Sequence, residues 1–269
     1  MAFKIIVCAK QVPDTNVIKI NPKTGTLIRD GVPSILNHDD NNALEEALKI
    51  KDKYDDVTVT VISMGPPQAT DLLFECIAKG ADEGILVSDR AVGGSDTWAT
   101  SNTLEAAIKK WEKENGPADL IFAGRQAIDG DTAQVGPEIA EHLGLPQVTY
   151  ALEAELTDDG LTILKECEDA NQKIAVSLPC LVTFTKPSFD PRYPTIKRKL
   201  AANRAEIPVL GEDAFPDIDK TRIGLKGSPT HVKKSFVPPR KQGGVMIKEE
   251  SNTASAQKLV AMLSEAHLI

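Results

Sequence analysis

The sequence contains few aromatic residues and few cysteines. Phe, Trp and Tyr together make up 4% of the 269 residues, and the four cysteines at 8, 76, 167 and 180 are isolated from one another. No cysteine has a metal-ligand spacing to another cysteine or to a histidine. We therefore expect reduced structural cysteines and no metal site, with Cys8 lining a site without being reactive.

Other absences exclude whole classes of protein. No run approaches the roughly 20 apolar residues that cross a bilayer, and no signal peptide precedes the first strand. We therefore expect a cytoplasmic protein without a membrane span. The net charge of −8 argues against a nucleic-acid partner. The histidines are scattered and do not cluster with Ser and Asp, so we assign no catalytic residue.

The first half of the chain alternates apolar runs of strand length with helical patterns. Strands are predicted at 3–9, 57–62, 81–88 and 119–123, and helices at 41–53, 67–79, 97–115 and from about 131. This alternation predicts an α/β fold with a parallel, doubly wound sheet and helices on both faces. The carboxyl ends of all four strands would lie at one edge of the sheet, where ligands bind in such folds.

The stretch from Gly124 to Gly136 is the most informative motif. It follows the fourth strand and reads as a glycine-rich turn that leads into a helix. Asp131 and Gln134 have the spacing of a capping box, which would place free N–H groups and the positive helix end at the turn. The glycines at 124 and 130 would let a ligand approach the backbone, and phosphate is the usual occupant. An ordinary capped βα turn is the alternative.

Polar turns also follow or flank other strand ends, at 8–15, 37–42 and 63–67. The six polar residues at 37–42 exceed what one helix cap requires, which suggests ligand hydrogen bonds. A solvated loop in which Asn42 and Glu45 form a capping box is the alternative. None of these turns is GxGxxG or GxxxxGK[ST], so neither the usual dinucleotide fingerprint nor a P-loop is indicated.

The pattern changes after residue 146. Short runs at 149–156, 161–166, 173–178 and 181–185 predict an antiparallel meander appended to the sheet, and residues 18–31 suggest a small hairpin.

The stretch from 186 to 204 is basic, as expected for a solvated face or a surface that docks an acidic partner. Residues 226–247 predict an extended arm, and 252–268 an amphipathic helix that lies on another subunit or folds back.

Together these motifs resemble the β subunit of the electron-transferring flavoproteins. The matching segments are Cys8–Thr15, Asn37–Ala47, Met64–Pro66, Gly124–Asp131 and Lys165–Thr183. Ala170 departs from the Gly, Asp or Glu that is usual at its position. The glycine-rich flavin motif of the family's α subunit is absent, so the β subunit is the better match.

The resemblance implies a fold of the adenine-nucleotide α-hydrolase type, with an adenine nucleotide at the grouped strand ends. The cofactor-binding residues that it implies are Cys8, Ala9, Val12, Pro13, Asp14, Thr15, Asn37, His38, Asp39, Asp40, Met64, Gly124, Arg125, Gln126, Ala127, Ile128, Asp129, Gly130, Asp131, Thr132, Ala133, Gln134 and Val135. Our hypothesis is that Thr132, Gln134 and the amides at the helix start hold phosphate and ribose. Residues 12–15 would then lie near a flavin ring.

The identity of the nucleotide depends on the branch of the family. Most members bind AMP as a structural group, whereas the electron-bifurcating branch binds FAD, which takes hydride from NADH. The Gln11–Thr15 segment resembles the bifurcating branch, so the resemblance implies FAD with NAD(H) as substrate, and AMP as the alternative. It also implies three partners: an α subunit, a flavin-containing dehydrogenase of the acyl-CoA or hydroxy-acid type, and ferredoxin or flavodoxin.

The same resemblance suggests a division of the chain. Residues 1–205 would form the nucleotide- and flavin-binding domain, with a dehydrogenase-docking loop around 191–196. Residues 206–269 would form an arm and helix that contact the α subunit. Two other classes of protein remain as alternatives: a nucleotide-binding stress or signalling module, and an ATP-consuming ligase or hydrolase. The latter would need a Ser-Gly-Gly type loop where this chain has Cys8–Gln11.

Overall fold

A computed structural model describes residues 3–14, 32–233 and 243–269. These residues form two compact units, one that extends to residue 233 and one that begins at 243. The hairpin predicted at 18–31 and the predicted site residue Thr15 lie outside the described residues. No helix in the described part of the chain is long and apolar enough to span a membrane.

The first unit is built on one large sheet, and its strand order is β11-β5-β4-β1-β6-β10-β7-β8-β9. The strands from β11 to β7 in this order are parallel to their neighbours. Their bounds are β1 Phe3–Cys8, β4 Val57–Met64, β5 Glu83–Val87, β6 Leu120–Gly124, β7 Gln147–Thr157, β10 Cys180–Phe184 and β11 Val209–Leu210. The four predicted strands are therefore confirmed, and they lie side by side.

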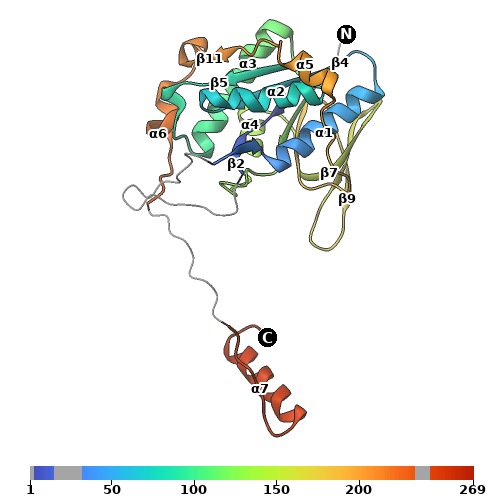
Figure 1. Ribbon diagram of the computed structural model, residues 1–269, viewed down its shortest axis with the longest axis vertical. Helices are drawn as coiled ribbons and strands as arrows, with labels where there is room; N and C mark the ends of the chain where they lie inside the picture. Colours follow the sequence, from blue (N-terminus) through green and yellow to red (C-terminus); the bar gives the residue numbers. More distant parts are fainter. Residues whose placement is uncertain (1–2, 15–31, 234–242) are drawn as a thin grey trace. The chain divides into compact units, whose positions relative to one another are not determined.

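Helices cover both faces of this sheet, as a doubly wound fold requires. Leu44 of α1 (His38–Lys53) and Leu73 of α2 (Thr70–Lys79) belong to the core on one face. Ile108 of α3 (Thr97–Asn115) and Ile139 of α4 (Val135–Leu143) belong to the core on the other. Figure 1 shows α1 and α2 together on one side of the strands. The predicted doubly wound α/β fold is confirmed.

Two predicted helix starts are wrong by a few residues. The first helix begins at His38, because residues 38–40 already have helical geometry. Asn42 donates to the Thr185 carbonyl and Glu45 binds Arg192, so they form no capping box.

The helix expected near Asp131 begins at Val135 instead. The backbone φ is +52° at Asp131 and +54° at Ala133, and these left-handed residues interrupt helical geometry. The Asp131 carboxylate accepts from the Gln126 side chain, 2.8 Å away, and does not cap the helix.

The predicted meander needs one correction. β7, β8 (Gly160–Lys165) and β9 (Gln172–Val176) are antiparallel to one another, as expected. The fourth run, β10, instead inserts between β6 and β7 and is parallel to both. All five residues of β10 are buried, which is the pattern of a strand covered on both faces.

Short elements complete the first unit. They are β2 Gln11–Pro13, β3 Ser34–Leu36, the 3₁₀ turns Pro67–Ala69, Arg90–Val92, Glu212–Ala214 and Lys220–Arg222, and the helices α5 Ile196–Ala202 and α6 Gly224–Gly227. β2 and β3 pair as a separate two-stranded antiparallel sheet.

The second unit contains α7 (Asn252–Glu265), which confirms the predicted C-terminal helix. The Ser251 hydroxyl caps it by accepting from the Ala254 N–H, 3.1 Å away. Among the described residues α7 contains no buried side chain, and Leu259 and Val260 are exposed. This helix therefore presents apolar surface that its own unit does not cover.

Candidate functional site

The direction of winding reverses between β1 and β6. The chain leaves β1 for β4 across the face that carries α1, whereas it enters β6 from α3 on the opposite face. In open α/β sheets, ligands bind outside the carboxyl ends of the strands at such a reversal. Cys8 ends β1 and Gly124 ends β6, so the region outside these two strand ends, called the crevice below, is the candidate site.

The Asp40 carboxylate bridges the two strand ends. One oxygen accepts from the Lys10 N–H at 2.7 Å, and the other accepts from the Gly124 N–H at 2.9 Å. Asp40 is 6% exposed. Burial raises the pKa of this carboxyl to about 7, against the lowering effect of its hydrogen bonds. Asp40 therefore fixes the separation of β1 and β6 at the reversal.

Gly124 is required by this contact. A Cβ atom at Gly124 would lie 2.3 Å from the Asp40 carboxylate and 2.6 Å from its backbone nitrogen. At Gly130, in contrast, a Cβ atom would meet nothing within 4 Å. The residue that closely approaches Gly124 therefore belongs to α1. Of the two glycines, only Gly130 has open space beside it.

Asn37 holds the first half of the loop that follows β6. Its side-chain oxygen accepts from the Ile128 N–H at 3.1 Å, and its amide donates to the Gln126 carbonyl at 2.8 Å. The Lys10 ammonium pairs with the Asp129 carboxylate at 2.6 Å. Among the polar residues at 37–42, Asn37 and Asp40 therefore bind this neighbouring loop, whereas His38 stays exposed.

The second half of the loop is open. Thr132 and Gln134 are exposed, and within the described residues the backbone N–H groups from 132 to 136 have no acceptor. The left-handed φ at Ala133 is followed by a right-handed conformation at Gln134. Alternation of this kind forms a concave nest of N–H groups, and the positive end of α4 adds to it. Such an arrangement can bind an anion such as phosphate.

The other predicted site residues lie on the same edge of the sheet. Cys8 and Ala9 are buried, Met64 is half-buried at the end of β4, Val12 and Pro13 belong to β2, and Asp14 is exposed. Burial raises the pKa of the Cys8 thiol to about 12, with a smaller contribution from Asp40, so the thiol is neutral. Among the described residues, no hydrogen bond or ion pair joins Met64 or Asp14 to the loop 124–136.

Two residues at this edge were missed by the sequence reasoning. The Ser63 hydroxyl is buried near the end of β4 and has no hydrogen-bond partner in the described part of the chain. The sequence feature that could have indicated Ser63 is a polar residue near the end of a strand rich in β-branched residues. The Tyr150 ring lies 5.9 Å from the Arg125 guanidinium, which is 3.3 Å from Asp39. No local pattern indicated Tyr150.

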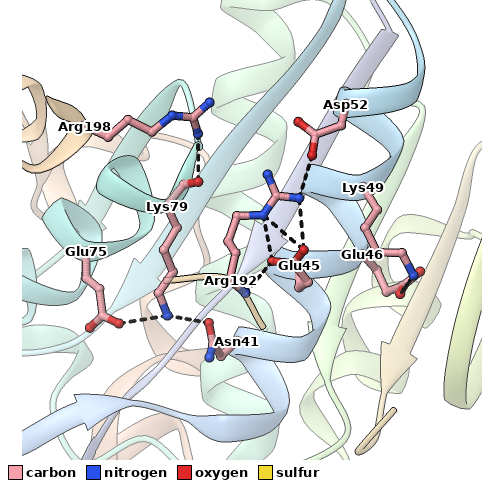
Figure 2. A network of polar contacts seen from close by, with 9 residues as sticks. All are labelled: Asn41, Glu45, Glu46, Lys49, Asp52, Glu75, Lys79, Arg192 and Arg198. Atoms are coloured by element: carbon pink, nitrogen blue, oxygen red, sulfur yellow. Dashed lines mark hydrogen bonds and ion pairs between the residues drawn. The ribbon is translucent and has the colours of Figure 1, made fainter. Parts of the chain in front are cut away.

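The basic stretch 186–204 is anchored at two arginines, as Figure 2 shows. Arg192 lies 2.9 Å from Glu45 and 2.7 Å from Asp52, both on α1. Arg198 donates to the Lys79 carbonyl at the end of α2, 2.8 Å away. Between these anchors, Tyr193 is 90% exposed and Ile196 is 81% exposed. The stretch is therefore held against α1 and α2 by its arginines, and it exposes apolar side chains.

Comparison with known proteins identifies the family. Residues 24–214 match the model of the electron transfer flavoprotein domain. The chain is 51% identical over 267 residues to the caffeyl-CoA reductase-Etf complex subunit CarD of Acetobacterium woodii, with 99% of this chain and all of the relative covered. It is 52% identical to the electron transfer flavoprotein subunit beta of Clostridium acetobutylicum, with the same coverage.

A further relative is the acryloyl-CoA reductase electron transfer subunit gamma of Anaerotignum propionicum, at 45% identity over 99% of this chain and all of the relative. These matches extend over nearly the whole chain and include proteins named as beta subunits. The chain therefore belongs to the electron transfer flavoprotein family, as a beta-subunit homologue.

Proposed function

We propose that this chain binds FAD in the crevice between β1 and β6. Together with an α subunit it passes electrons between NAD(H), a flavin dehydrogenase and a low-potential acceptor such as ferredoxin or flavodoxin. The observation that carries the proposal is the run of unpaired backbone N–H groups from 132 to 136. These groups face no acceptor in the described residues, and they stand at the start of α4.

A bound flavin would supply the redox chemistry, and the protein would bind it, orient it and tune it. The N–H groups at 132–136 and the hydroxyl of Thr132 would hold its phosphate and ribose. Asn37 and Asp40 keep the loop in the geometry that these contacts need. The Ser63 hydroxyl, buried without a partner in the described chain, is a further donor at this edge. Residues 12–14 would lie near the flavin ring.

The names of the relatives support the proposed partners. One relative is named as a subunit of a caffeyl-CoA reductase-Etf complex, and another as an electron transfer subunit of an acryloyl-CoA reductase. We infer that this chain also serves a flavin dehydrogenase of the acyl-CoA type, which docks on Tyr193 and Ile196. The α subunit covers the exposed apolar residues of α7.

The nucleotide content of the complex tests the cofactor. The chain is coexpressed with its α partner, the purified complex is denatured, and FAD and AMP are counted by chromatography. We expect two FAD and no AMP per heterodimer. One FAD with one AMP would overturn the FAD assignment and make the site a structural AMP site, and the absence of any second nucleotide would overturn the site itself.

Docking is tested separately with Ile196→Ser. Burying an exposed Ile at an interface centre contributes on the order of 1–2 kcal/mol, so kcat/KM for the dehydrogenase should fall roughly tenfold. The nucleotide content should not change. The matched control is Leu225→Ser, because Leu225 is 59% exposed and belongs to α6, outside the stretch 186–204. Equal losses in the two variants would contradict the proposed docking surface.

A further inference from the structure

Tyr150 has a backbone conformation that a bulky residue rarely adopts. Its φ is +60°, and the register of β7 shifts across this residue against β10, between Val148 and Ala151, and just after it against β8, between Ala151 and Glu153. Its N–H donates to the Thr183 hydroxyl at 3.3 Å, and its carbonyl accepts from the Glu166 N–H at 2.8 Å. A strained residue of this kind persists only where its surroundings hold it, and such residues concentrate at functional sites.

The side chain of Tyr150 contacts the candidate site. The ring centroid is 5.9 Å from Cζ of Arg125, within the range of a cation–π interaction. The Nε atom of Arg125 lies 3.3 Å from the Asp39 carboxylate. In the described residues no acceptor faces the terminal N–H groups of Arg125. The guanidinium is thus held by Asp39 and by the ring, while its terminal donors stay available.

The bulge at Tyr150 also borders the start of α4. Thr183, which binds the Tyr150 N–H, would lie 2.4 Å from a Cβ atom at Gly136, so it packs closely against that turn of the helix. β10 pairs with β6 and β7 at the same level, since Phe184 is the partner of both Gly124 and Ala151. Tyr150, Arg125 and the open N–H groups therefore share one edge of the sheet.

We propose that Tyr150 is a positioning residue of the nucleotide site. Its strained backbone holds the ring against Arg125, so that the terminal N–H groups of the guanidinium bind a phosphate oxygen of the nucleotide. This inference rests on the proposed function, because it assumes that a nucleotide occupies the crevice. Arginine is suited to the task because its planar fork can bind two phosphate oxygens at once.

The test measures the affinity of the nucleotide-depleted α/β complex for AMP and for FAD by calorimetry, beside its melting temperature. Tyr150→Leu removes the ring face and should weaken binding about three- to tenfold. Tyr150→Phe keeps the ring and should restore the affinity. Tyr150→Gly accepts the left-handed φ and should melt higher than Tyr150→Leu, yet bind as weakly as that variant. In an Arg125→Gln background, Tyr150→Leu should have no further effect.

A matched control comes from Tyr54, which follows the last residue of α1. Its ring lies 5.4 Å from the Lys53 ammonium. Tyr54→Leu removes a similar pair away from the crevice and should leave nucleotide affinity unchanged. Affinities that follow the melting temperatures, or Tyr150→Leu binding as tightly as the unchanged complex, would overturn the inference. Absence of AMP and FAD binding by the unchanged complex would overturn the proposed function instead.

Discussion

The loop between β6 and α4 has two halves that differ in how they are held. Residues 124–131 are bound by buried side chains from other segments, above all Asn37, which is 0% exposed, and Asp40. Residues 132–136 follow directly, and in the described chain their backbone N–H groups have no acceptor. The backbone of one half is held by hydrogen bonds from other segments, and the other half offers backbone donors.

The difference shows how an open set of donors can be prepared in advance. Unpaired N–H groups cost little where water reaches them, but they bind an anion well only if their geometry is fixed before binding. Here residues 124–131, the closed half, are held rigidly by side chains of α1 and its N-cap. The left-handed conformation of Ala133 sets the direction of the N–H groups in residues 132–136, the open half. Stability and affinity should therefore depend on different residues of the same loop.

The largest effect is expected from a pair of glycine substitutions, both within residues 124–131. Gly124→Ala should lose about 3 kcal/mol of unfolding free energy, because its Cβ would overlap Asp40. Gly130→Ala should change it by no more than about 0.5 kcal/mol, because the space there is open. Urea unfolding of the full chain measures both. Similar losses would show that α1 does not approach Gly124 as described.

The pH dependence of stability tests Asp40. Burial raises its pKa from the ordinary value of 3.8 to about 7 in the native chain, so the native state holds the proton more tightly than the unfolded chain does. This contribution is fully present below about pH 4 and is lost as the pH rises to about 7. Between pH 5 and pH 8 the unchanged chain should lose about 2–3 kcal/mol relative to Asp40→Asn. Parallel pH profiles for the two proteins would contradict the buried titration.

A smaller loss is expected at Asn37. Asn37→Ala removes an acceptor and a donor that the loop uses, and leaves the Ile128 N–H and the Gln126 carbonyl unpaired. We expect a loss of about 2 kcal/mol in the free energy of unfolding. The neighbouring His38 is exposed, so His38→Ala is the matched control and should stay within about 0.5 kcal/mol. Equal losses of unfolding free energy in the two variants would show that Asn37 does not hold the loop.

The smallest effect on stability is expected in the open half. Replacing Thr132 and Gln134 together by alanine should change the unfolding free energy by about 0.5 kcal/mol at most, since both side chains are exposed. Nucleotide affinity should nevertheless fall about tenfold, because bonds to a charged phosphate are lost. Unchanged nucleotide affinity of the α/β complex in calorimetry would disprove the phosphate assignment.

Much of the fold could be predicted because it depends on local periodicity. The β-branched run at Val57–Met64 and the helical spacing of Leu104, Ile108 and Trp111 report burial directly, and both elements formed where expected. The helix starts were less accurate. Asn42 and Asp131 have the residue types of caps, but tertiary partners use their side chains differently.

The sequence by itself determined the alternating βα pattern and the family, and it predicted the edge of the sheet that carries the candidate site. Only the tertiary structure decided that Asp40 joins β1 to β6, that β10 lies beside β6, and that Tyr150 is held against Arg125. The reason is physical. Periodicity records whether a side chain is buried, whereas Asp40 and Gly124 are 84 positions apart, and nothing local in either segment specifies the other.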